Sequence, residues 1–147
     1  MPLPSDTGAT CRRMAALDVG DSRVGIAICD ALGLTVTGLG VVRRVGGVRD
    51  LDAIARLLAP YSPEQLVVGL PLNMDGSEGR QAAKTRRFGE RVAAHLQLPL
   101  AFQDERLSSF EAEERLRTAG LRGARRRALV DQVAATVILE DYLAQVR

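Results

Sequence analysis

RMAALDVGDSRVGIAIC, residues 13–29, is the stretch that decides the fold. Its two short apolar runs, residues 13–18 and 22–29, are separated by Gly20 and Asp21. A strand, a tight turn and an antiparallel strand give this pattern, so we expect a β-hairpin to open the domain. Residues 34–42 are rich in Val, Leu and Thr and predict a third antiparallel strand before the break at Gly46.

Helices and strands alternate in the rest of the chain. Apolar residues recur at helical spacing over 51–58 and stop before Pro60, whose ring cannot continue a helix. Further strands are predicted at 65–70 and 98–103, and further helices at 79–96, at 108–120 and from residue 130 to the end, with a turn at 73–77 and a basic connector at 121–127. The order β-β-β-α-β-α-β-α-α predicts an α/β fold, a mixed sheet with helices on its faces.

Length and composition exclude several classes of protein. A chain of 147 residues is near the usual size of one domain, so we expect a flexible tail over 1–12 and a single domain over 13–147. Two cysteines and one histidine cannot supply a four-ligand zinc site. No apolar run reaches the length of a membrane span and no signal-peptide pattern opens the chain, which predicts a cytoplasmic protein with free thiols.

Positive charge is concentrated in the middle of the chain. Residues 80–127 carry 12 basic and 6 acidic groups, although the net charge of the whole chain is only +2. Nineteen of the twenty basic residues are arginine, which pairs bidentately with phosphate, so a nucleic-acid partner is one explanation. The other is a GC-rich genome, which would favour arginine codons without functional meaning, and composition leaves both open.

Carboxylates stand at the ends of three predicted elements. Asp18 ends the first strand, Asp104 and Glu105 end the last strand, and Asp131 opens the last helix. Because adjacent strand residues point opposite ways, only one of Asp104 and Glu105 should face a shared site. The spacing places Asp131 on the apolar face of its helix, within about 60° of four less polar residues: Ala134, Ala135, Ile138 and Tyr142.

Three converging carboxylates would need compensation. A buried unpaired carboxylate is costly, and Mg²⁺ or Mn²⁺ prefers carboxylate oxygens, so a metal site is one interpretation. In the alternative, Asp18 serves only the hairpin turn and Asp131 is a first-turn acid favoured by the helix dipole.

Five sequence blocks carry a family resemblance. They are LDVG at 17–20, RVGIA at 23–27, VVGLPLNMDGS at 67–77, DERLS at 104–108 and DQVAA at 131–135. In this order they resemble the YqgF family, also called RuvX. The resemblance implies an RNase H-like fold with sheet order 3-2-1-4-5, and a nuclease that matures the 5′ end of the 16S ribosomal RNA precursor or resolves Holliday junctions. Asp21 and Ser108 depart from the family pattern without touching the acids.

The resemblance also implies a site. Asp18 would lie on the central strand, Glu105 after a strand and Asp131 on the last helix, with Asp104 in reserve for Glu105. Two-metal hydrolysis would place two Mg²⁺ or Mn²⁺ ions about 3.5 to 4 Å apart, bridged by Asp18 and each completed by one other acid. Eight further residues are expected to contact nucleic acid or to line the groove that holds it: Arg23, Asn73, Ser77, Arg106, Arg122, Arg125, Arg126 and Arg127. For the last four, which belong to the basic connector, the alternative is a solvated loop that binds nothing.

Two other functions fit parts of the pattern. Asp18-Val19-Gly20 before a hairpin also resembles the first phosphate motif of the actin and Hsp70 group, although those proteins close two domains around a nucleotide. A non-catalytic ribosome-assembly factor would use only the arginine surface. The sequence leaves open RNA or DNA as substrate, Mg²⁺ or Mn²⁺ as cofactor, and monomer or homodimer, since symmetric cutting of a junction needs two active sites.

Overall fold

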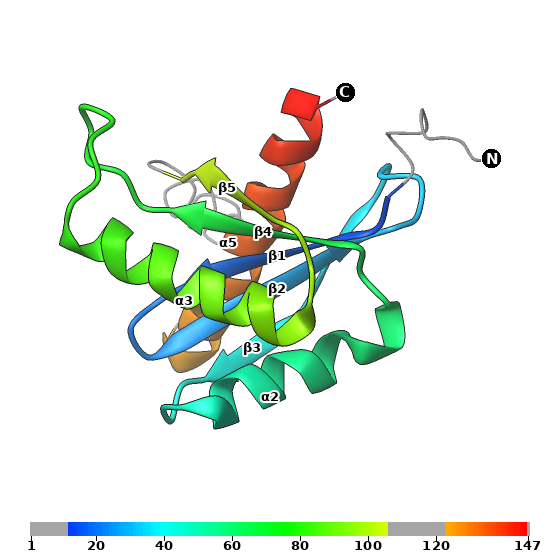
Figure 1. Cartoon of the computed structure of the whole chain (residues 1–147), viewed down its shortest axis with the longest axis horizontal. Helices are drawn as coiled ribbons and strands as arrows, with labels where there is room; N and C mark the ends of the chain where they lie inside the picture. The colour runs from blue at the N-terminus through cyan, green and yellow to red at the C-terminus, as the bar shows by residue number, and fades with distance from the viewer. Residues whose placement is uncertain (1–11, 106–122, 147) are drawn as a thin grey trace.

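The computed structural model describes residues 12–105 and 123–146, with only the helical backbone for 123–128 (Figure 1). Most of the predicted tail and the predicted helix over 108–120 lie outside the described residues. The single-domain boundary at residue 13 therefore stays a prediction.

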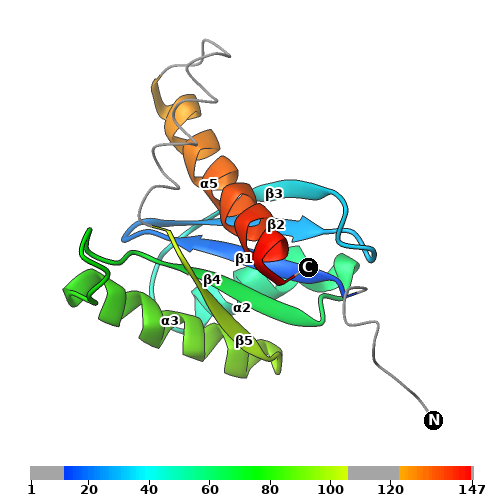
Figure 2. The same cartoon turned by 90° about the horizontal axis from the view of Figure 1, so that it is seen from above.

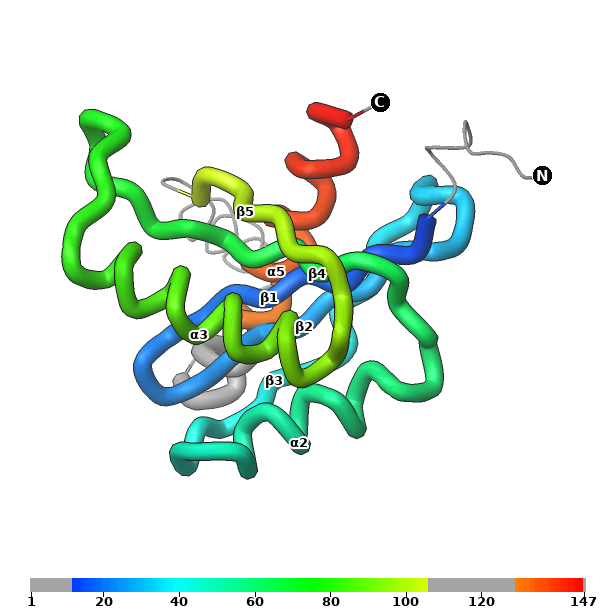
Figure 3. Tube along the Cα trace, viewed as in Figure 1, coloured from blue at the N-terminus to red at the C-terminus, as the bar shows by residue number. Residues whose placement is uncertain are grey.

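The strands form one five-stranded sheet in the order β3-β2-β1-β4-β5 (Figure 3). β1 (Met14–Val19), β2 (Arg23–Cys29) and β3 (Val36–Arg43) are antiparallel neighbours. β4 (Gln65–Leu70) lies parallel to β1, and β5 (Leu100–Asp104) lies parallel to β4. The predicted mixed sheet and its order 3-2-1-4-5 are confirmed.

Helices cover both faces of this sheet (Figure 2). α2 (Val48–Leu58) and α3 (Arg80–Leu96) pack on one face, and α5 (Gly123–Val146) packs on the other. A short 3₁₀ turn, η1 (Ala59–Tyr61), follows α2 at Pro60, where the sequence predicts the helix to end. None of the described helices combines the length and apolarity that a bilayer crossing needs.

Alternation along β1 assigns its residues to the two faces. Ala15, Leu17 and Val19 belong to the core under α2 and α3, whereas Met14 and Ala16 belong to the core under α5. Asp18 therefore continues the row that faces α5. β1 has strands on both sides and helices on both faces, which explains why its sequence is an almost unbroken apolar run.

The last helix begins earlier than the sequence pattern indicates. α5 starts at Gly123, so residues 123–127 of the predicted connector are helical and Asp131 does not open the helix. Arginine and alanine are good helix formers, and a run of positive charge does not end a helix by itself. Asp131 lies eight residues inside α5, more than two turns from its start, so its interpretation as a first-turn acid is wrong.

Candidate active site

Asp18 lies near the edge of the sheet where three parallel strands end. It is the penultimate residue of β1, and Glu105 directly follows β5. The backbone N–H of Glu105 donates to the Leu70 carbonyl at 3.1 Å, which anchors that residue at the end of β4. Leu17 pairs with Val68, so Asp18 lies beside Gly69 on the strand between the two acids. The parallel register thus brings together residues 87 positions apart.

Gly69 makes room for the Glu105 side chain. A Cβ at position 69 would lie 2.8 Å from Oε2 and 2.9 Å from Cδ of Glu105, closer than real Cβ atoms approach other atoms. Cδ1 of Ile138, which would lie closer still, and the Glu105 carboxyl group thus share the space that a side chain at 69 would fill. The sequence analysis missed this role of Gly69, although a glycine inside a predicted strand is a known signal of close approach.

Two more glycines let α5 approach the sheet at Asp131. A Cβ on Gly25 of β2 would overlap the backbone carbonyl of Asp131 and lie 3.0 Å from the Gln132 nitrogen. A Cβ on Gly38 of β3 would lie 2.5 Å from Cγ of Gln132. Close packing at these two positions sets the height of α5 above the strands, and with it the position of the Asp131 carboxylate.

The three acids act on one another electrostatically. Burial raises the pKa of Asp18 from its ordinary value of 3.8 to about 6; a hydrogen bond with the Glu105 side chain opposes this rise, and the negative charge of Asp131 adds to it. A hydrogen bond between two carboxyl groups requires a proton that they share. The structure therefore joins Asp18 to Glu105 by a hydrogen bond and places Asp131 close enough to act on the charge of Asp18.

Arg23 supplies the compensating charge on Asp131. Its Nε donates to Oδ2 of Asp131 at 2.5 Å, and the two side chains are 36% and 20% exposed. Arg23 is thus engaged with an acid, whereas the sequence analysis assigns it to substrate phosphate. The described residues contain no group of three Asp, Glu, His or Cys side chains already arranged as metal ligands.

Asp104 and Glu105 differ in their surroundings. The Asp104 side chain is exposed, and Gln103 before it is buried, as alternation along an edge strand requires. The Glu105 side chain turns to Gly69 and Asp18. Of the two adjacent acids, Glu105 is the one that joins the cluster.

Asn73 and Ser77 close the exposed turn that follows β4. The Asn73 side-chain amide donates to Oγ of Ser77 at 2.9 Å, and its backbone N–H donates to the Ser77 carbonyl at 2.8 Å. Gly76, between them, has φ of 88°, which favours glycine. The predicted substrate contacts of Arg106 and Arg122, and of the Arg125, Arg126 and Arg127 side chains, lie outside the described residues.

Comparison with known proteins identifies the family. Residues 12–145 match the family model described as RuvX, Holliday junction resolvase. The chain belongs to the RuvX family. A RuvX relative from a Synechococcus species is 45% identical over 131 residues, covering 89% of this chain and 88% of its own. One from Moorella thermoacetica is 47% identical, covering 89% and 94%. Both bear the provisional name pre-16S rRNA nuclease.

Solved structures share the RuvX fold. RuvC of Thermus thermophilus in complex with a Holliday junction substrate has a TM-score of 0.55 at 14% identity, covering 92% of this chain and 96% of its own. The fowlpox virus resolvase bound to junction DNA has a TM-score of 0.57 at 10% identity, covering 91% and 98%. At such low identity the likeness shows the fold alone, and it confirms the expected RNase H-like architecture. The family match confirms the expected nuclease class over the nucleotide-binding alternative.

Proposed function

We propose that residues 13–147 form one cytoplasmic domain that hydrolyses nucleic-acid phosphodiester bonds at Asp18, Glu105 and Asp131. The observation that carries the proposal is the convergence of these carboxyl groups from β1, the end of β5 and α5, with the pKa of Asp18 raised to about 6 by burial. Strongly perturbed acids that gather where strands end are typical of catalytic sites.

The carboxyl groups fit a divalent cation chemically. Their oxygens are the ligands that Mg²⁺ and Mn²⁺ prefer, and Gly69 leaves open the space in which Glu105 meets Asp18. Ionised Asp18 and Asp131 repel each other, and a bound cation would remove this electrostatic cost. We infer that the three acids hold two such ions. When bound, divalent cations stabilise the charge of a phosphodiester undergoing hydrolysis and acidify water.

Binding of cations would change both the protonation and the ion pairing of the three acids. The hydrogen bond between Asp18 and Glu105 needs one proton, which the pair would have to give up for both carboxylates to serve as ligands. As a ligand, Asp131 would no longer pair with Arg23, whose guanidinium donors would then be available to a substrate phosphate. In this proposal Arg23 first holds Asp131 in place and then binds substrate, which reconciles its predicted role with its observed partner.

We propose the precursor of 16S ribosomal RNA as the substrate, because relatives 45% and 47% identical bear that name. The family description favours a second candidate, the four-way DNA junction. Symmetric junction cutting needs two active sites and hence a homodimer, whereas trimming of an RNA end needs only one. Sedimentation of the active species separates the two modes.

The test offers purified protein a structured precursor RNA and a branched DNA, each in Mg²⁺ or Mn²⁺. We expect Asp18→Asn and Asp131→Asn to abolish cleavage while binding remains, since they remove ligand charge but little surface. Glu105→Gln and the adjacent Asp104→Asn form a matched pair, of which only the first should abolish cleavage. Retained cleavage by Asp18→Asn would reject the site.

Two other outcomes would replace the proposal. RNA binding without metal-dependent cleavage by the unaltered protein would indicate a non-catalytic assembly factor. Thermal stabilisation by ATP that Asp18→Asn abolishes would indicate a nucleotide-binding module of the actin and Hsp70 type.

A further inference from the structure

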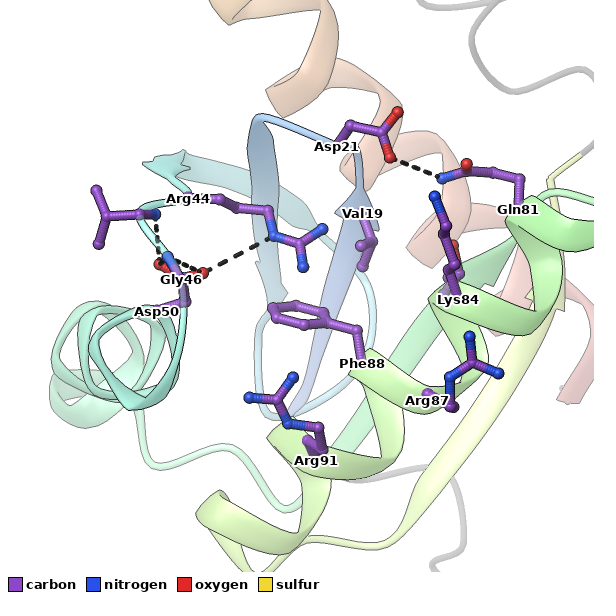
Figure 4. Close-up of a pocket in the computed structure, with 12 residues that line it drawn as sticks. Val19, Asp21, Arg44, Gly46, Asp50, Gln81, Lys84, Arg87, Phe88 and Arg91 are labelled. Atoms are coloured by element: carbon purple, nitrogen blue, oxygen red, sulfur yellow. Dashed lines mark hydrogen bonds and ion pairs between the residues drawn. The ribbon is translucent and has the colours of Figure 1, made fainter.

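A second polar site lies on the sheet face opposite the acids. It is a cavity of about 430 Å³ between the β1–β2 turn, the loop and first turn of α2, and α3 (Figure 4). Val19 lines it, whereas Asp18, one residue earlier, faces α5. Four cationic side chains line the cavity: Arg44, Lys84, Arg87 and Arg91.

The charge of this cavity is positive. Among the described residues that line the cavity, the acids are Asp21 and Asp50. Asp50 is 3% exposed, and its carboxylate accepts the backbone N–H of Val45 at 2.8 Å and of Gly46 at 3.1 Å, with Arg44 Nε at 3.8 Å. The Asp50 carboxylate therefore stabilises the loop that precedes α2 through these contacts.

Three of the cations have no ion pair within residues 12–105 and 129–146: Lys84, Arg87 and Arg91. They follow one another at helical spacing along α3, on either side of the buried Phe88. Unpaired cations gathered around a cavity attract an anion.

Arg44 is held rigidly at the centre of the cavity. Its guanidinium stacks on the Phe88 ring, 4.2 Å from the ring centroid, and its Nη1 donates to the Gly20 carbonyl at 2.7 Å. Figure 4 shows the guanidinium between Asp50 and the α3 side chains. A fixed guanidinium with remaining donors is suited to an oxyanion, because little side-chain freedom is lost on binding.

Thr85 contributes a hydroxyl group, unpaired among the described residues, to the wall of the cavity. The residue lines the cavity and is 1% exposed, yet its Oγ1 has no hydrogen-bond partner in the part of the chain that the structure describes. Buried hydroxyl groups are nearly always paired, so an unpaired one beside a positive cavity marks a position where a partner is missing.

We propose that this cavity binds a backbone phosphate of the nucleic-acid substrate, at a nucleotide near the cleaved bond. The proposal rests on the proposed nuclease function. Asp21 is three residues from Asp18, so their Cα atoms are at most about 11 Å apart, which is the rise of about three duplex nucleotides. The cavity and the acids thus lie near the same end of β1, and in this proposal a strand passing round the β1–β2 turn contacts both.

The test measures how RNA binding depends on salt. Lys84→Gln combined with Arg91→Gln removes two unpaired exposed charges from the cavity without touching the core. The matched control is Arg56→Gln with Arg80→Gln, two exposed arginines of α2 and α3 that do not line it. Binding of a labelled precursor RNA duplex is measured in EDTA, where no cleavage occurs.

We expect the cavity variant to bind the RNA about tenfold more weakly than the unaltered protein. In a plot of the logarithm of the association constant against the logarithm of the salt concentration, its slope should be shallower by about 1 for each phosphate that the protein no longer neutralises. The control should keep its slope. An unchanged slope in the cavity variant, or an equal weakening in the control, would overturn the proposal.

Two further arms identify the source of the phosphate. Inorganic phosphate should weakly stabilise the unaltered protein against heat, and the cavity variant should lose this effect. ATP that stabilises more strongly than the RNA duplex would overturn the proposal in favour of a free-nucleotide site. Asp18→Asn should lose cleavage but keep the salt slope; if it cleaves, the active-site proposal fails while the cavity result still stands.

Discussion

We expect Asp18→Asn to stabilise the metal-free protein at neutral pH. Ionised Asp18 lies among buried side chains, next to Glu105 and within the field of Asp131, and the fold tolerates its charge at a cost. Asparagine has nearly the same shape and can still form a hydrogen bond with Glu105. The substitution should therefore remove the cost and little else.

The pKa of Asp18 sets the size and the sign of this effect. A change from 3.8 to about 6 corresponds to at most about 3 kcal/mol, since each pKa unit is about 1.36 kcal/mol. The folded state binds the proton more tightly than the unfolded state, so the penalty is absent below 3.8, grows as pH rises and is complete above about 6. Asp18→Asn should gain about 3 kcal/mol near pH 7.5 and about 1 kcal/mol near pH 4.5.

Urea unfolding in EDTA at the two pH values measures the difference, with Asp104→Asn as the control for loss of an exposed carboxylate at the same sheet edge. Adding Mg²⁺ or Mn²⁺ should stabilise the unaltered protein at neutral pH but not the variant, because a bound cation offsets the same penalty. A variant no more stable than the unaltered protein near pH 7.5, or a gain independent of pH, would refute the reasoning.

Three other substitutions test single contacts. Gly25→Ala places a Cβ against the Asp131 carbonyl, a backbone atom that cannot rotate away, so the free energy of unfolding should fall by about 1 to 3 kcal/mol in urea, with loss of cleavage. Arg23→Gln should raise Mn²⁺ affinity in a titration, because Asp131 loses its competing cation; unchanged affinity would show that the pair does not compete. Thr85→Val should raise the free energy of unfolding by about 1 kcal/mol, and a decrease would mean that the hydroxyl has a partner.

The strands and the acids at their ends could be predicted from the sequence because both depend on local patterns, whereas the sheet order 3-2-1-4-5 was implied by the resemblance to the RuvX family. Apolar runs of strand length, broken by glycine and proline, mark the strands, and alternation with period two assigns Asp18 to one face. The same alternation shows that only one of Asp104 and Glu105 can join Asp18. The resemblance to RuvX proteins favoured Glu105, and the register of β5 against β4 places its side chain there.

The start of α5 could not be predicted, because the arginines of residues 125–127 are compatible with either a helix or a solvated loop. Packing decides between them: α5 is held against β2 and β3 where Gly25 and Gly38 let it approach, and the helix continues outward from that contact. A helix gains most of its stability from such burial and not from intrinsic propensity.

The sequence by itself determined the strands and the helices of the first hundred residues, since each follows from near neighbours in the chain. The choice of the acids also used the resemblance to the RuvX family, and their catalytic role stays a prediction. Only the tertiary structure decided that Arg23 pairs with Asp131, 108 residues away, and that Arg44 joins Lys84, Arg87 and Arg91 around one cavity. The physical reason is that electrostatic and hydrogen-bond partners are chosen by distance in space. Distances between remote segments are set by the packing of helices on the sheet, which no local pattern records.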